Sequence, residues 1–170
     1  EARGTELLPM LLAREVRQTL ALCAADKACD GAYPDLESRL DQSLKTWLSS
    51  PEEFRGQLIT VSDLASFLLD AIYGWEGIKA LPRDLDSILK GDLSPIVDYL
   101  QGGGDFAEGQ LLAHFCKEEL PFEDPAAMRQ LAADDPLAKA VLANTQRLFS
   151  ACADWPVGAP NPKENTPVTS

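Results

Sequence analysis

Apolar residues return every three or four positions along most of the chain, which is the spacing that places them on one face of an α-helix. In the clearest segment they stand at i, i+3, i+4, i+7 and i+8: Leu64, Phe67, Leu68, Ala71 and Ile72. Thr60 or Ser62 can accept a hydrogen bond from the free N–H groups at the start of this helix, and Gly74 is expected to end it. The pattern therefore predicts an amphipathic helix that ends before Gly74.

The same spacing predicts further helices before and after this segment. They are expected at 12–23, from Pro34 to Leu48, from Pro82 to Gly91, from Ser94 to the glycines at 102–104, from Phe106 to Phe115, around Met128 and Leu131, and from Pro136 to Cys152. Between these helices the short stretch 58–61, which contains β-branched residues, is expected to be extended. The fold class is therefore predicted to be all-α, a compact bundle of about seven short helices.

The C-terminal end of the chain has a different character. Four of the twelve prolines lie in the last fifteen residues, and the apolar periodicity is lost there. A proline cannot donate a backbone hydrogen bond, so this composition does not favour a helix. The chain is expected to divide into a helical domain, 1–155, and an extended Pro-rich tail, 156–170.

Composition and charge exclude two classes of partner. The longest apolar run, 7–13, is far shorter than the roughly 20 residues that a membrane-spanning helix needs. Fifteen basic residues against twenty-seven acidic ones give a net charge of −12. This charge repels the phosphate backbone of nucleic acids. We therefore expect neither a membrane span nor a nucleic-acid partner.

No arrangement of residues in the sequence is typical of an active site. A triad-type hydrolase needs a nucleophile, a base and an orienting acid, and the chain has one histidine, His114. It stands between Ala113 and Phe115 in an apolar helical stretch, which favours a packed, hydrogen-bonded side chain. No Gly-x-Ser-x-Gly elbow occurs. We expect no catalytic residue, no cofactor and no metal site in this chain.

Glu118 and Glu119 are the pair of residues with a candidate binding role. They follow a predicted helix and precede Leu120-Pro121-Phe122, the start of a loop, where a scaffold can hold side chains outward. Two adjacent carboxylates can bind a cation such as the free amino terminus of a peptide. The competing interpretation is a solvated acidic patch in a chain that is rich in acids.

Four cysteines permit three disulfide pairings: Cys23, Cys29, Cys116 and Cys152. The local pair Cys23–Cys29 would close a small loop, and the remaining pair would join two distant segments. The intervals do not fit the spacing of two to four residues typical of structural zinc sites. Four buried, reduced thiols are the other interpretation. Two disulfides would indicate an oxidising compartment, so that the protein is secreted or periplasmic.

Several short motifs follow one another along the chain. They are Cys23-Ala-Ala-Asp-Lys-Ala-Cys29 with Ala32-Tyr33-Pro34-Asp35-Leu36, Val61-Ser62-Asp63-Leu64 leading to Tyr73, Leu81-Pro82, Lys90-Gly91-Asp92, Phe115-Cys116-Lys117-Glu118-Glu119-Leu120-Pro121-Phe122, and Cys152-Ala153-Asp154-Trp155-Pro156. Their order and spacing resemble the helical lid of secreted α/β-hydrolase serine exopeptidases, the tripeptidyl and prolyl aminopeptidase-like family. The resemblance covers the chain from about Leu20 to its last residue.

In that family the nucleophile elbow precedes the lid, and the catalytic acid and histidine follow it. The chain contains none of these segments, so it is expected to be a lid without its hydrolase core, with the tail leading back towards that core. The resemblance implies the disulfides Cys23–Cys29 and Cys116–Cys152, and it gives His114 no catalytic role. It also implies that Glu118 and Glu119 bind the α-ammonium group of a substrate, as lid glutamates do in related aminopeptidases.

The implied function is gating of substrate access to the active site of a serine α/β-hydrolase, with an aminopeptidase that acts on a free N-terminus as the expected parent. The expected partners are the hydrolase core and a peptide or small-molecule substrate, and an exposed apolar inner surface would let the isolated lid self-associate. The alternative is a free-standing extracytoplasmic helical module whose acidic surface captures cationic ligands. An independent enzyme built on His114 is disfavoured, because no nucleophile accompanies it.

Overall fold

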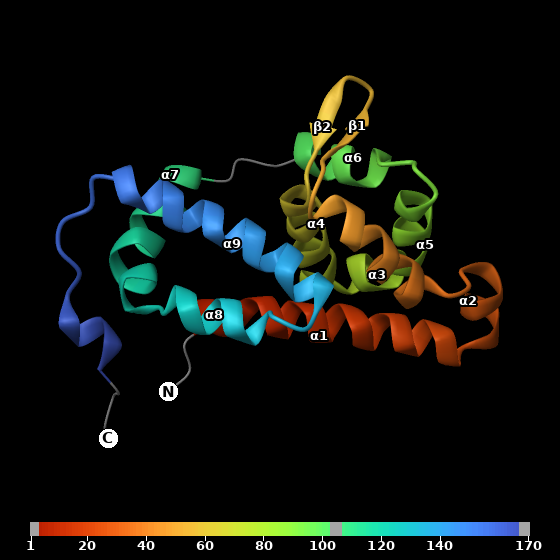
Figure 1. Ribbon diagram of the computed structural model, residues 1–170, viewed down its shortest axis with the longest axis horizontal. Coiled ribbons are helices and arrows are strands. Elements are labelled where there is room, and N and C mark those ends of the chain that lie inside the picture. Colours follow the sequence, from red (N-terminus) through yellow and green to blue (C-terminus); the bar gives the residue numbers. More distant parts are fainter. Residues whose placement is uncertain (1–3, 103–106, 167–170) are drawn as a thin grey trace.

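The structure is a computed structural model, and it describes residues 4–102 and 107–166 (Figure 1). Within these residues the chain forms nine α-helices, a two-stranded hairpin, one π-helical turn and two 3-10 turns. The α-helices are α1 (Gly4–Ala25), α2 (Lys27–Ala32), α3 (Leu36–Trp47), α4 (Val61–Tyr73), α5 (Trp75–Leu89), α6 (Ser94–Gly102), α7 (Glu108–His114), α8 (Pro125–Leu131) and α9 (Pro136–Asp154). The predicted all-α fold is confirmed.

The two longest helices, α1 and α9, lie against each other and organise the core. In Figure 1, α9 runs diagonally above α1, and α4 packs against both α9 and α5. The largest fully buried side chains include Leu12, Val16, Leu40, Leu44, Leu68, Leu81, Leu85, Leu137 and Val141. All but Leu81 lie within segments predicted to be helical, as expected if burial of an apolar face stabilises each helix in the folded domain.

α4 begins with a reciprocal cap. The Thr60 hydroxyl accepts the backbone N–H of Asp63 at 3.3 Å, and the Asp63 carboxylate accepts the backbone N–H of Thr60 at 2.8 Å. Thr60 is therefore the cap, whereas Ser62 is buried within the first turn of the helix, which ends at Gly74 as predicted. The predicted apolar face is buried, with Ile72 half-buried at its end: Leu64, Phe67, Leu68, Ala71 and Ile72.

The expectation that Pro82 begins a helix is wrong, because Pro82 lies inside α5, which begins at Trp75. A proline in a helix interior removes one backbone hydrogen bond and costs about 3 kcal/mol. Packing offsets this cost, since Leu81 is fully buried and Gly77 lets α5 approach α4 closely. A Cβ atom on Gly77 would lie 2.3 Å from the carbonyl oxygen of Ala71. Contact with α4 therefore supports a helix that continues through Pro82.

Strand pairing in the described residues is limited to one hairpin. β1 (Glu52–Phe54) runs antiparallel to β2 (Gln57–Ile59), and the two residues of the connecting turn, Arg55 and Gly56, both have positive φ angles of 51° and 79°. Positive φ at both positions is the requirement of the turn that best joins twisted strands. The extended stretch predicted at 58–61 therefore includes the end of β2, whereas its last two residues form the cap and first turn of α4.

The described residues form nine α-helices, whereas about seven were predicted. One reason is that α2 has no buried residue and therefore no apolar pattern in the sequence. The Asp26 carboxylate accepts hydrogen bonds from two backbone N–H groups at the start of α2, and this cap marks the boundary between α1 and α2.

The predicted tail is not extended throughout. A 3-10 turn spans Pro162–Asn165, and the Asn161 side chain accepts a hydrogen bond from the backbone N–H of Lys163 at its start. Positions 103–106 and 167–170, which include the start of the helix predicted from Phe106, lie outside the described residues.

Candidate functional site

Two disulfides join segments of the helical domain. Cys23–Cys29 ties the end of α1 to α2, and Cys116–Cys152 ties the π-helical turn Phe115–Glu119 to the end of α9. The cysteines thus pair as the family resemblance implies, and they are not reduced thiols. In the part of the chain that the structure describes, no group of three His, Cys, Asp or Glu side chains is placed to hold a metal ion.

The predicted glutamate pair lies on the π-helical turn that continues α7. This turn, Phe115–Glu119, closes with a hydrogen bond from the N–H of Leu120 to the carbonyl oxygen of Phe115. Because such a turn closes between residues i and i+5, the residues four and five positions after a given residue both come to lie beside it. His114, at the end of α7, is followed at these two positions by Glu118 and Glu119. Short π-helical turns occur frequently at functional sites.

His114 faces both carboxylates. Its Nδ1 lies 2.8 Å from Oε2 of Glu118, and its Nε2 lies 3.6 Å from Oε1 of Glu119. All three side chains are between two-fifths and one-half exposed, so the expectation of a packed histidine is wrong, while the expected hydrogen bond is present. The ring of Phe115 meets the imidazole edge-on, with centroids 5.8 Å apart. The i, i+4 spacing of His114 and Glu118 is the signal in the sequence from which this contact could have been predicted.

A third carboxylate extends the negative surface of the pair towards the start of α1. Glu123 is half-buried, and its Oε2 accepts the backbone N–H of Glu6 at 3.1 Å. Burial raises the pKa of Glu123, and the charges of Glu6 and Glu119 raise it further, although N–H groups of Thr5 and Glu6 act in the opposite direction. The surroundings of the pair therefore favour a cation over an anion.

An open hollow of about 390 Å³ adjoins His114. It is lined by one turn of α7 and the residue before it: Ala107, Gln110, Leu111 and His114. If a ligand placed its positive charge against the glutamates, the uncharged remainder of the ligand would have room in this hollow.

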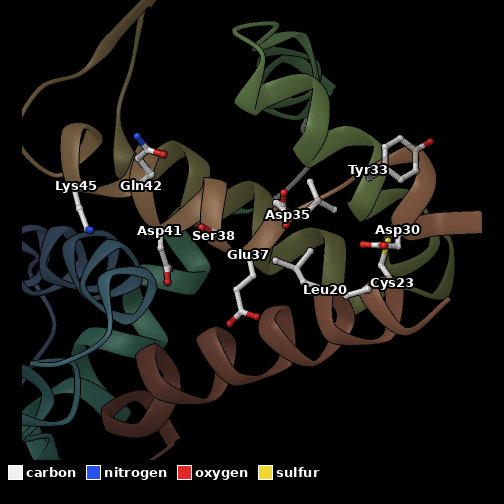
Figure 2. Close-up of a pocket in the computed structure, with 12 residues that line it drawn as sticks. Leu20, Cys23, Asp30, Tyr33, Asp35, Glu37, Ser38, Asp41, Gln42 and Lys45 are labelled. Atoms are coloured by element: carbon white, nitrogen blue, oxygen red, sulfur yellow. The ribbon is translucent and has the colours of Figure 1, made fainter. Parts of the chain in front are cut away.

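A larger hollow, a groove of about 910 Å³, lies elsewhere, between α1, α2 and α3 (Figure 2). Its floor includes Leu20, Cys23 and Leu36, which are buried. Its acidic lining residues are Asp30, Asp35, Glu37 and Asp41, against a single cationic one, Lys45. Arg17 binds Glu37 and Asp41 from beside the groove. No local sequence pattern predicts this groove, because it forms where three helices meet.

No protein-family model, curated protein or solved structure matches this chain. No helix within 4–102 or 107–166 is both long and apolar enough to cross a membrane.

Proposed function

We propose that this protein is a lid that gates substrate access to the active site of a secreted or periplasmic serine α/β-hydrolase. In this proposal Glu118 and Glu119 bind the α-ammonium group of the substrate, so that the hydrolase acts at a free amino terminus. The observation that carries the proposal is that both carboxylates lie on one π-helical turn, half-exposed, against a single imidazole. The two disulfides support the assignment to an oxidising compartment.

A substrate ammonium group suits this pair chemically. It carries three N–H donors, and two carboxylates supply more than enough acceptors for them. Hydrogen bonds between an ammonium group and a carboxylate are charge-assisted, and they strengthen as water is excluded. A hydrolase core that covered the half-exposed pair would supply this exclusion, which is the physical role of a lid.

Exposed aromatic side chains support a docking role. Tyr73 and Trp75 are 85% and 71% exposed, and they flank Gly74, where the chain turns from α4 into α5. Large exposed apolar side chains that lie together are typical of surfaces that contact another protein. This junction is the surface we assign to the hydrolase core, or to a second copy of the chain when the core is absent.

The ammonium site is tested by calorimetry with tri-alanine amide and with its N-acetylated form. We expect the free peptide to bind at least tenfold more tightly, and Glu118→Ala to weaken its binding by about 10- to 100-fold, the effect of a hydrogen bond to a charged group. Glu108→Ala, an exposed carboxylate on α7, is the matched control and should leave binding unchanged. Equal binding of the free and acetylated peptides would contradict the proposed site.

The lid assignment has its own test, the reading frame of the gene on both sides of this segment. A Gly-x-Ser-x-Gly motif before it, with an aspartate and then a histidine after it, supports a hydrolase core. In that complete enzyme, Glu118→Ala should lower kcat/KM for substrates with a free amino terminus and leave N-blocked substrates unaffected. A reading frame confined to the helical domain would rule the lid out.

The second candidate function is a free-standing module that binds cationic ligands, and the acidic groove of Figure 2 favours it. In that case a basic peptide would bind between α1 and α3 rather than at the π-helical turn. Asp30→Asn with Asp35→Asn would then weaken binding, while Glu118→Ala would not. The lid proposal predicts the opposite result for the same two variants.

A further inference from the structure

His114 occupies the place where the proposed site would receive a ligand's positive charge. Its Nδ1 is 2.8 Å from Glu118 and its Nε2 is 3.6 Å from Glu119. Among the described residues it is the only basic side chain within ion-pair distance of either carboxylate. We propose that His114 is an internal counter-ion that competes with the ligand's ammonium group for Glu118 and Glu119, so that loss of its proton opens the site.

The two ring contacts give this competition its chemical basis. An imidazolium ion has an N–H on both nitrogens and can satisfy both carboxylates, whereas a neutral imidazole has one N–H and one lone pair. In the neutral tautomer with its proton on Nδ1, the bond to Glu118 is kept and a lone pair is turned towards Glu119. Deprotonation therefore removes the positive charge that lies 3.6 Å from Glu119, and this carboxylate becomes available to an ammonium group. Imidazole changes its charge between about pH 5 and 8.

The other charged groups near His114 do not replace it as the counter-ion. The neighbouring elements α7, the π-helical turn, the segment after it, α1 and α9 carry Glu108, Lys117, Glu123, Glu6, Arg147 and Asp154. Arg147 lies 3.8 Å from Asp63, and Lys117 is in ion-pair contact with neither Glu118 nor Glu119. Most of these groups are acidic, so acidification also weakens the attraction for a cation by protonating carboxylates. A variant at His114 is needed to separate the two effects.

The inference rests on the proposed ammonium site and adds a pH dependence to it. When one ammonium group displaces one proton, affinity rises by up to about tenfold per pH unit below the midpoint of the His114 titration. The chain has one histidine, so the imidazole signals in the proton NMR spectrum of protein without a histidine tag report that midpoint directly. We expect affinity for tri-alanine amide to rise over the same pH range in which His114 loses its proton.

Three proteins, measured by calorimetry from pH 5.5 to 7.5, test the inference. The natural chain should bind tri-alanine amide more tightly as the pH rises. His114→Gln should bind at pH 5.5 as tightly as the natural chain does at pH 7.5, with little further change. His114→Lys keeps its charge throughout this range, so it should bind weakly at every pH. Because His114 is half-exposed, circular dichroism is expected to show both variants folded.

The possible outcomes separate this inference from the proposed function. Binding of the peptide with the same affinity at both pH values, or a pH dependence that persists in His114→Gln, would overturn the competition and leave the ammonium site standing. Binding that survives in Glu118→Gln with Glu119→Gln would place the peptide elsewhere and overturn both. Absence of binding by the natural chain and by His114→Gln at every pH would also overturn both.

Discussion

Arg17 on α1 donates two parallel hydrogen bonds to Asp135, which lies 118 positions away in the sequence: Nε to Oδ2 at 3.0 Å and Nη2 to Oδ1 at 2.8 Å. The same Oδ1 atom of Asp135 accepts the backbone N–H groups of Leu137 and Ala138 at the start of α9. One carboxylate therefore both caps α9 and attaches it to α1. Because α1 and α9 organise the core, this contact holds together the two helices on which the rest of the fold packs.

Removing the guanidinium group should destabilise the protein. Arg17→Ala is expected to lower the free energy of unfolding by about 2–3 kcal/mol, because it leaves partly buried carboxylates without their charged donor. Arg14→Ala is the control, since Arg14 is exposed and pairs with its neighbour Glu15, and exposed pairs contribute about 0–1 kcal/mol. Urea denaturation measures both changes, and equal losses would contradict the structural role of Arg17.

Asp135 should make the stability of the fold depend on pH. The hydrogen bond from Arg17 is the largest cause that holds the pKa of Asp135 below its usual value, against opposing burial. A depressed pKa stabilises the fold above the unfolded value of about 3.9, and that stability is lost as the pH falls through the folded value. Asp135→Asn should therefore be less stable than the natural chain at pH 7, with the gap closing below about pH 3.9. A gap independent of pH would show that the charge of Asp135 does not matter.

The two disulfides should contribute unequally to stability. Cys116 and Cys152 are 36 positions apart, and Cys23 and Cys29 are 6 apart. Loop-closure entropy then predicts losses of about 4 kcal/mol and about 2 kcal/mol, respectively, when each pair is replaced by serine. Thermal and urea unfolding of the two double variants check this order. A larger loss on removing the short loop would show that native packing, rather than the entropy of the unfolded chain, dominates.

Gly77 should not tolerate a side chain. Gly77→Ala would place Cβ 2.3 Å from the Ala71 carbonyl oxygen, so α4 and α5 must move apart, at a cost of about 1–3 kcal/mol. Gly109→Ala is the matched control, because its Cβ would meet only Trp155 at 3.9 Å and alanine is the better helix former. We expect the melting temperature to fall in the first variant and to stay or rise in the second. A stable Gly77→Ala protein would contradict the close approach of the two helices.

Glu123 should act on stability in the opposite sense to Asp135. Burial, and then the charges of Glu6 and Glu119, raise the pKa of Glu123. A raised pKa in an acid favours the folded state below the unfolded value of about 4.3, and this contribution is lost as the pH rises through the folded value. Glu123→Gln should therefore be more stable than the natural chain at pH 7 and similar to it at pH 3. Glu108→Gln, on an exposed part of α7, should show no such difference.

Local patterns predicted the elements whose signals lie within a few residues of one another. The apolar face of α4, a cap at Thr60 or Ser62 and an end at Gly74 could be predicted from neighbouring residues, and the structure shows all three, with Thr60 as the cap. α5 could not be predicted in this way, because its first turns depend on the contact of Gly77 with α4. α2 buries no side chain, so it left no periodic signal.

The sequence by itself determined the all-α class, the helical faces that form the core, and the presence of two adjacent carboxylates after a helix. Only the tertiary structure decided that Glu118 and Glu119 lie on a π-helical turn against His114, with Glu123 beside them. The reason is that helical periodicity is a local property of the backbone. The path of the chain after α7 depends instead on a disulfide to α9 and on hydrogen bonds to α1, which join segments far apart in the sequence.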